Sequence, residues 1–483
     1  MRKKLLCFLL ICMMALQCAC GAEQNTGQTA STQQIETSEV SETTESAAEE
    51  EASRAMPQWA ASAIIYEVNI RQYTEEGTFE AFSKHLDRLK EMGINTLWFM
   101  PIHPISEENR LGTLGSYYSI SDYKAVNPEF GTMEDFVELV DLAHSMGFKV
   151  MMDWVANHTG WDHVWMEHPD WYLQDENGNV VSPPGMGWND VAQLNYDNEE
   201  MRNAMIDAMR FWIEEADIDG FRCDYAGGVP RDFWEEARAE LSETKEIYML
   251  AEDNTQKALM LSAFDSNYNW DLYSGMVSVA MGSKKASSLK SIVNAANTYP
   301  EGAFPINFMD NHDKNSWEGT VSKNFGDDAI GAFSTLIFTV TGAPLIYSGQ
   351  EAGLDYSLEF FEKDQIDFSN LPYEELYQSL CTLKLEHEAL YNGSYGGEIT
   401  FFDCGNENIL MYERSTENET IIVLLNLSKE EQQIVTPYQQ EEQMTLLLSG
   451  DADGVESNEA VITEPLFTSE SVLPPWSYYV YGR

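Results

Sequence analysis

The chain has 483 residues, of which 43% are hydrophobic and 12% aromatic, so it has the material for one large domain and a smaller one. Its 80 acidic residues against 28 basic ones give a formal net charge of -52. Such a charge repels the phosphate backbone of nucleic acids and the surface of anionic lipids. We therefore expect no nucleic-acid partner, and we expect most of the carboxylates to lie on a solvated surface.

The N-terminus has the pattern of an export signal. Basic residues at positions 2–4 precede an apolar run, residues 5–16, that is short for a membrane span. Residues 1–20 are thus predicted to be a signal peptide, and Cys20 stands where bacterial lipoproteins are cleaved and lipidated. Gln17 occupies a position that is usually Leu in such sites, so plain secretion is the alternative. The chain is predicted to be secreted and held at the bacterial cell surface by a lipid anchor, with no other membrane contact.

Residues 21–57 are predicted to be a disordered tether. Most of this stretch consists of Ser, Thr, Gln and Glu, and large apolar side chains are almost absent, so it cannot bury enough surface to fold. Behind a lipidated Cys20, it would hold the folded part away from the membrane.

The cysteines do not form a disulfide framework. Three of the seven would be lost with the signal peptide, which leaves Cys20 and, in the folded part, Cys223, Cys381 and Cys404. Nothing in the sequence resembles a Cys/His metal cluster, and we interpret these thiols as small core residues.

From residue 58 to 390 short β-rich runs alternate with amphipathic helical patterns, which predicts an α/β fold, a (β/α)₈ TIM barrel. Helical spacing is visible, for example, at Phe136, Leu139, Val140 and Ala143. Eight strands are predicted, at residues 64–70, 96–101, 149–155, 220–225, 247–252, 264–270, 304–309 and 345–347. The segment 157–197 interrupts the alternation with Trp, Pro and Gly, and it is predicted to be a short inserted loop domain after the third strand.

Residues 391–483 contain β-rich runs and polar turns instead of helices. We expect a separate C-terminal domain of antiparallel all-β structure, a β-sandwich. Its last strand, residues 478–481, is expected to dock back on its own sheet.

Acidic residues stand where several of the predicted barrel strands end. Because the active site of such a barrel forms at the C-terminal ends of its strands, these carboxylates are candidates for catalysis. Asp224 ends the fourth strand, with Arg222 two residues before it on the same face. We expect Arg222 to lower the pKa of Asp224 and keep it ionised. Glu252 follows three apolar residues, so its pKa is expected to be raised, as a proton donor needs.

Two further polar groups complete the set: residues 153–158 leave the third strand, and the triplet Asn311-His312-Asp313 ends the seventh. A single carboxylate at a strand end is most often a helix cap or a surface charge. Four such groups on four strands favour a carboxylate-based active site.

At this point the sequence resembles the α-amylase family, glycoside hydrolase family 13. The matching blocks are DWVANH at 153–158, GFRCD at 220–224, the segment around Glu252, and NHD at 311–313, in the family's order and spacing. The resemblance implies that Asp224 is the nucleophile, Glu252 the general acid/base and Asp313 the carboxylate that binds the distorted sugar. It also implies retention of anomeric configuration, for which the two catalytic carboxyls need to lie roughly 5 to 5.5 Å apart.

The resemblance assigns four further residues to substrate binding. Arg222 would orient Asp224, while His158 and His312 would hydrogen-bond sugar hydroxyls. Tyr118 would stack on the same sugar, and it is chosen over Tyr117 because the family's Tyr lies four residues before an Asp, here Asp122. Five tryptophans could stack on sugars at outer subsites, although core packing is the simpler expectation for each of them. They are Trp161, Trp165, Trp171, Trp188 and Trp317.

The sequence departs from the family after Asp224. Many members have a Lys-His pair there that contacts the next sugar and the calcium site, whereas this chain has Tyr-Ala-Gly-Gly at 225–228. No cofactor is expected to be required. Calcium remains an open alternative with Asn157 as one candidate ligand, and the metal ligands are otherwise unknown.

The expected function is hydrolysis of α-1,4 bonds in starch or maltooligosaccharides by a monomeric enzyme, through a covalent glycosyl-enzyme. The motifs leave open an α-glucosidase, a transglycosylase or a trehalose-forming enzyme of the same chemistry. A third alternative, a non-catalytic glycan-binding surface protein, is disfavoured because all three carboxylates are present.

Overall fold

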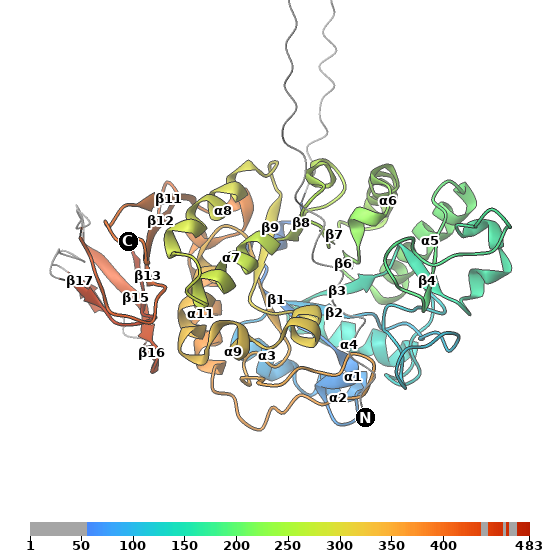
Figure 1. Ribbon diagram of the computed structural model, residues 1–483, viewed down its shortest axis with the longest axis horizontal. Helices are drawn as coiled ribbons and strands as arrows, with labels where there is room; N and C mark the ends of the chain where they lie inside the picture. Colours follow the sequence, from blue (N-terminus) through green and yellow to red (C-terminus); the bar gives the residue numbers. More distant parts are fainter. Residues whose placement is uncertain (1–55, 436–442, 457–459, 463–470) are drawn as a thin grey trace, which may run out of the picture. The chain divides into compact units, whose positions relative to one another are not determined.

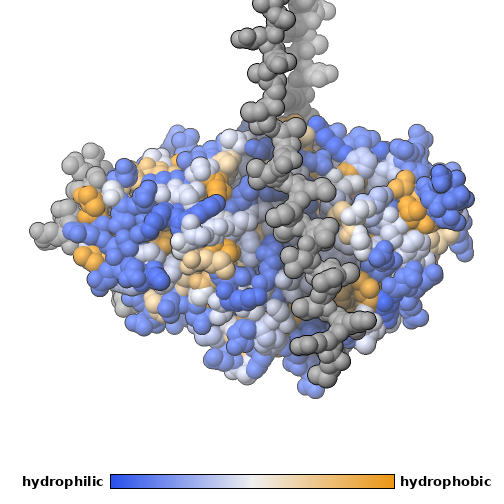
Figure 2. Space-filling view, viewed as in Figure 1, coloured by the Kyte–Doolittle hydropathy of each residue, from blue (hydrophilic) through white to orange (hydrophobic). Residues whose placement is uncertain are grey.

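The computed structural model describes residues 56–435, 443–456, 460–462 and 471–483, which all belong to one compact unit. The predicted signal peptide, Cys20 and the predicted tether up to residue 55 lie outside the described residues. No described helix is both long enough and apolar enough to cross a membrane. The described surface seen in Figure 2 is mainly hydrophilic, with small scattered apolar patches.

Eight parallel strands close into a barrel in the order β1-β10-β9-β8-β7-β6-β3-β2 (Figure 1). They are β1 (Ile65–Val68), β2 (Thr96–Phe99), β3 (Lys149–Trp154), β6 (Gly220–Cys223), β7 (Tyr248–Ala251), β8 (Ser266–Tyr268), β9 (Phe304–Phe308) and β10 (Ala343–Tyr347). Their residues are buried except for Lys149, as expected of parallel strands covered on both faces. All eight predicted strands are confirmed, including the one within 264–270.

Helices connect the barrel strands, and their apolar stripes face the sheet. They are α1 (Ile70–Tyr73), α2 (Phe79–Ser83), α3 (Leu86–Met92), α4 (Met133–Ser145), α5 (Glu199–Ala216), α6 (Arg231–Thr244), α7 (Trp270–Ala280), α8 (Leu289–Ala295), α9 (Val321–Phe325), α10 (Ile330–Thr339) and α11 (Glu374–Glu386). Helix α4 begins with a capping box between Thr132 and Asp135. Its buried positions are the four whose spacing predicted the helix.

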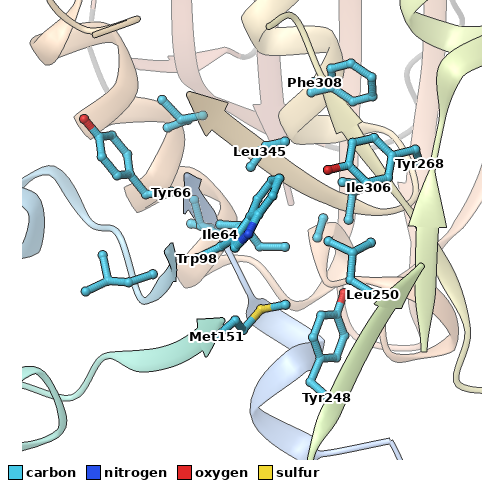
Figure 3. Close-up of a cluster of buried hydrophobic side chains, with 14 of the residues drawn as sticks. Ile64, Tyr66, Trp98, Met151, Tyr248, Leu250, Tyr268, Ile306, Phe308 and Leu345 are labelled. Carbon is cyan, nitrogen blue, oxygen red and sulfur yellow. The ribbon is translucent and has the colours of Figure 1, made fainter. Parts of the chain in front are cut away.

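The barrel interior is a packed apolar core. Figure 3 shows Trp98 at the centre of this core, with Ile64, Met151 and Leu345 around it. Tyr268 and Phe308 lie in the same cluster. Charged groups at the C-terminal ends of the strands therefore rest on an apolar layer and are shielded from water on that side.

The insertion after β3 contains one small antiparallel sheet, β4 (His158–Gly160) with β5 (Val191–Gln193). In its first pair, His158 faces Gln193. The side chain of Gln193 donates to the backbone oxygen of Asn157 at 2.8 Å. The insertion is thereby fastened to the exit of β3.

The C-terminal part is antiparallel and all-β, as predicted. Its strands are β11 (Glu398–Phe402), β12 (Ile409–Ser415), β13 (Thr420–Asn426), β14 (Gln432–Gln433), β15 (Met444–Asp451), β16 (Gly454–Glu456), β17 (Ala460–Ile462), β18 (Val472–Leu473) and β19 (Tyr478–Gly482). The final strand, β19, pairs with β13 and β15, so the expected docking on its own sheet is confirmed.

The described strands of the expected β-sandwich lie in two layers of unequal size. The described strands form one seven-stranded sheet, and β14 and β18 add only a two-stranded sheet. The small layer packs on one face of the large sheet through Ile434 and Leu473. The barrel covers the other face, where the Tyr412 hydroxyl on β12 lies 2.5 Å from that of Thr339 on α10. A single hydrophobic cluster accordingly runs from the barrel strands to Val423 and Val480 in the sheet.

Candidate active site

Arg222 is the centre of the charged cluster at the C-terminal end of the barrel. Its guanidinium is fully buried and lies 5.2–5.8 Å from the ring centroids of Trp98, Tyr118 and Tyr268. One of its nitrogens, Nη1, donates to Asp153 Oδ1 and to Asp224 Oδ1, both at 3.0 Å. The other, Nη2, lies 3.0 Å from Glu252 Oε1 as an ion-pair contact without the geometry of a hydrogen bond. One cation is thus shared by three carboxyl groups.

Asp224 and Glu252 come from neighbouring strands. Because β6 and β7 pair in parallel, with Cys223 opposite Ala251, the residues that follow them emerge side by side. Their side chains are 13% and 17% exposed, so both reach the surface of the site while most of each is enclosed. The backbone N–H of Tyr225 donates to Glu252 Oε2 at 2.9 Å. Tyr225 is held in a left-handed conformation, φ 42°, at the turn that leads away from Asp224.

Burial sets the protonation of these two carboxyls. It raises the pKa of Glu252 to about 7, although Arg222 opposes the shift. It likewise raises the pKa of Asp224 to about 6, again against Arg222 and with Asp153 adding repulsion. The expected raised pKa of Glu252 is confirmed. The expected lowering of the pKa of Asp224 is wrong. The loss of solvation on burial raises this pKa more than Arg222 lowers it, because Arg222 also pairs with Asp153 and Glu252.

His312 forms the opposite wall of the site. Its Nδ1 contacts the Glu67 carboxylate and its Nε2 lies 2.9 Å from the Tyr118 hydroxyl. Asp313 is 39% exposed, and its Oδ2 lies 3.5 Å from the same Nε2. Burial alone lowers the pKa of His312, but Asp313 and Glu67 raise it to about 9. The imidazole is therefore a cation at neutral pH.

Tyr118 lies against His312 and Asp153, whereas Tyr117 packs under Arg71. The Tyr118 ring stacks on His312, with centroids 5.4 Å apart, and its hydroxyl also donates to Asp153 Oδ2 at 3.1 Å. The structure thus brings Tyr118, Arg222 and His312 together with Asp224, Glu252 and Asp313 through direct contacts.

His158 lies at the start of the insertion, on β4. It is buried, and burial lowers its pKa to about 4, so the ring is neutral near pH 7. The amide of Asn157 donates to its Nδ1, which leaves the proton of the neutral ring on Nε2. Its ring also lies 5.5 Å from that of Trp188. A neutral imidazole with Nε2–H is suited to donate a hydrogen bond to a hydroxyl oxygen.

Asn157, the candidate calcium ligand, is hydrogen-bonded within the protein. Calcium takes six to eight oxygen ligands, whereas the Asn157 side-chain oxygen already accepts from Gln193 Nε2 at 3.2 Å. Across the part of the chain that the structure describes, no group of three or more His, Cys, Asp or Glu residues could hold a metal. The three cysteines of the folded part are buried free thiols, as predicted.

Two important residues were given no role from the sequence. Asp153 bridges Arg222 and Tyr118 and also accepts from the Trp98 indole at 3.2 Å. Glu67 sits fully buried in β1 beneath His312. A charged residue inside an otherwise apolar barrel strand is a visible signal, because burying a carboxylate without a partner is costly. Phe360, which stacks near Tyr118, lies in an irregular loop and left no such signal.

The sequence of the barrel matches a known family model. The model described as "Alpha amylase, catalytic domain" matches residues 24–178 and 186–374. The chain belongs to the α-amylase family. Residues 399–463 of this member of the family match a second model, "Maltogenic Amylase, C-terminal domain".

Curated relatives include amylases and enzymes of related activity. The chain is 27% identical over 391 residues to alpha-amylase MalA of Haloarcula japonica, covering 77% of this chain and 56% of the relative. It is 30% identical over 387 residues to the maltogenic alpha-amylase of Bacillus acidopullulyticus, covering 73% and 63%. The chain thus spans about three fifths of the length of these two relatives.

Solved structures share the architecture over almost their whole length. The noncanonic maltogenic alpha-amylase AmyB of Thermotoga neapolitana superimposes with a TM-score of 0.77 and 31% identity, covering 87% of this chain and 98% of that one. An alpha-amylase of Lactobacillus plantarum gives a TM-score of 0.75 at 28% identity, covering 88% and 99%.

Proposed function

We propose that the protein is a retaining hydrolase of α-1,4-glucosidic bonds in starch or maltooligosaccharides. The observation that carries the proposal is the shared guanidinium. Arg222 contacts Asp224 and Glu252 with its two terminal nitrogens, so both carboxyls lie within reach of one glycosidic bond. His312, Tyr118 and Asp313 face them across the site and supply a ring-binding wall.

In the first step, Asp224 attacks the anomeric carbon while Glu252 protonates the departing glycosidic oxygen. A covalent glycosyl-enzyme forms and the leaving sugar keeps the proton. In the second step, Glu252 takes a proton from water, and the resulting hydroxide attacks the same carbon and releases Asp224. Two inversions leave the configuration retained. Asp313 and the cationic His312 bind hydroxyls of the distorted sugar, and neutral His158 adds a further donor.

The descriptions of one matching family model and one relative support a preference for maltose as product. A maltogenic C-terminal model matches residues 399–463, and a maltogenic enzyme is among the relatives at 30% identity. We therefore propose short maltooligosaccharides, maltose foremost, as products. Cyclomaltodextrinases and a trehalose synthase of Thermus thermophilus also match at 24–26% identity, so transfer to a second sugar is the alternative outcome to test.

The test is a product analysis of the purified chain with starch, maltoheptaose, pullulan, maltose and trehalose, with Glu252→Gln as the control. Short maltooligosaccharides that are absent in the control, released first as the α-anomer, are expected. Glucose alone, longer transfer products or interconverted disaccharides would reassign the enzyme within the family. No turnover of any substrate would contradict the proposal and favour a glycan-binding protein.

We also propose that the chain is exported and lipid-anchored through Cys20. The support is the basic, apolar and Cys-containing pattern of residues 1–20. Cells expressing the chain and fed a labelled fatty acid are expected to label it, and Cys20→Ser is expected to abolish the label and release active enzyme. An unlabelled chain that is secreted in both forms would establish plain secretion.

A further inference from the structure

An exposed tryptophan stands directly beside the proposed active site. Trp317 lies in the π-helical segment Lys314–Glu318, which begins immediately after Asp313, and 56% of its surface is exposed. Its ring packs against Phe360 at 5.5 Å and Phe361 at 6.0 Å. Leaving so much indole surface in water is unfavourable, and large exposed aromatic surface next to a site is typical of a binding surface.

This aromatic group continues the ring-binding wall of the site. The ring of Phe360 lies nearly parallel to that of Tyr118, at 16° and 6.2 Å, and 6.3 Å from His312. Tyr118, Phe360 and Trp317 therefore form a connected row that leads outward from the residues proposed to hold the reacting sugar. We call Trp317, Phe360 and Phe361 the aromatic platform.

The platform is fixed by hydrogen bonds on both of its segments. The Asn315 side-chain oxygen accepts from the backbone N–H of Leu358 at 2.8 Å, which joins the two segments. The Glu362 carboxylate accepts from the backbone N–H of Thr113 at 2.9 Å. A surface that is held in place before binding loses little conformational entropy when a ligand lands on it.

The position of the acid determines which part of the substrate reaches the platform. Glu252 protonates the leaving oxygen, so the leaving sugars extend past Glu252 and its neighbour Tyr225. The platform adjoins Tyr118 and His312 on the opposite wall. Sugars that lie over the platform therefore belong to the part of the chain that stays attached to Asp224.

We propose that the aromatic platform binds the glucose unit that precedes the reacting one, on the non-reducing side, with Trp317 stacked on its apolar C–H face. This inference rests on the proposed function and deepens it. Stacking of this kind needs no charged partner and gives preference to substrates with at least two glucose units before the cleaved bond.

The experiment compares maltoheptaose with 4-nitrophenyl α-glucoside, which has one glucose and cannot reach the platform. The ratio of kcat/KM for maltoheptaose to that for the aryl glucoside is expected to fall about tenfold in Trp317→Ala and to recover largely in Trp317→Phe. The control is Tyr395→Ala. Tyr395 is an aromatic residue, 39% exposed, whose neighbour Ser394 bonds Gly302 before the N-terminal end of β9, away from the site. An unchanged ratio in Trp317→Ala would overturn the inference.

A binding measurement separates this inference from the proposed function. Glu252→Gln is titrated with maltoheptaose while tryptophan fluorescence is recorded, alone and combined with Trp317→Phe. A saturable change that is lost in the double variant supports the platform, even if the wild-type chain turns over no substrate. A change that survives in the double variant, or no binding at all, contradicts it.

Discussion

Arg222 decides the electrostatics of the site because it is one buried cation among three carboxyl groups. Its guanidinium forms ion pairs with Asp153, Asp224 and Glu252, so no single carboxylate has the whole positive charge to itself. Burial thus raises the pKa of both Asp224 and Glu252, and the negative charge of Asp224 adds to the rise at Glu252.

The first prediction concerns the pH dependence of kcat/KM, which reports the free enzyme. Asp224 must be ionised, so activity is lost as pH falls below about 6, and Glu252 must be protonated, so activity is lost as pH rises above about 7. A bell-shaped profile with its maximum between these values is expected with maltoheptaose as substrate. A maximum near pH 4 would show that burial does not control these carboxyls.

The second prediction concerns Glu67, which supports His312 from beneath. In Glu67→Gln the negative charge is lost, so the pKa of His312, about 9, is expected to fall by about one unit or more. The titration is followed by NMR on chains labelled with ¹⁵N-histidine. His158 is the internal control, since its pKa of about 4 results from burial without a carboxylate partner. An unchanged pKa of His312 would show that Asp313 alone keeps the imidazole charged.

Secondary-structure elements were predicted from the sequence where pattern and packing agree. The barrel strands and α4 are buried on the faces that their apolar residues mark. Small elements such as β4, β5 and the segment around Trp317 are stabilised by tertiary contacts, which leave no period in the sequence. The strand-end carboxylates could be found from the sequence because the strands that carry them could be. The location of Phe360 could not, because its loop has no such pattern.

Polar contacts also hold elements together at the other end of the barrel. Asp219 lies just before β6 and is almost fully buried. Its carboxylate contacts the imidazole of His144 on α4 at 2.7 Å and the ammonium group of Lys149 on β3 at 2.9 Å, and it accepts a hydrogen bond from the backbone N–H of Val150 at 2.9 Å. Burial raises its pKa, but these bonds outweigh burial and hold the pKa well below its usual range. Asp219 therefore stabilises the fold above its unfolded pKa, and that contribution is lost as pH falls through acid values.

The third prediction follows from this cluster. Asp219→Asn is expected to reduce the free energy of unfolding by about 2–4 kcal/mol at pH 7, and by less near pH 3. Urea denaturation at both pH values measures it. The matched control is Asp217→Asn. Lys245 contacts both Asp217 and Asp219, but Asp217 is 66% exposed, and its left-handed backbone, φ 52°, suits Asn. This control is expected to change stability by less than about 0.5 kcal/mol. Equal effects of the two variants would contradict the role of burial.

At the scale of the whole molecule, the barrel and the C-terminal sheet share one core. Arg414 of β12 is buried and donates to the backbone oxygen of Thr339 at 3.0 Å, at the C-terminal end of α10. The Trp476 ring lies 5.9 Å from that of Phe333 in the same helix. The sheet therefore covers both apolar and polar groups of the barrel.

The fourth prediction is that the barrel is not stable without the sheet. A chain that ends at residue 390 is expected to be insoluble or inactive, because α10 loses the cover of its apolar face and the Arg414 contact at its C-terminal end. The full chain is expected to unfold in a single calorimetric transition. A soluble truncated chain with unchanged kcat/KM, or two separate transitions, would show that the parts are independent.

The contact between Glu67 and His312 also has a consequence for synthesis. Glu67 belongs to the first barrel strand, which pairs with β10, and it touches a residue that is made 245 positions later. The site therefore cannot assemble until the ribosome has released the last barrel strand. A nascent chain therefore carries Asp224, Glu252 and Asp313 in its sequence before its barrel can close around them.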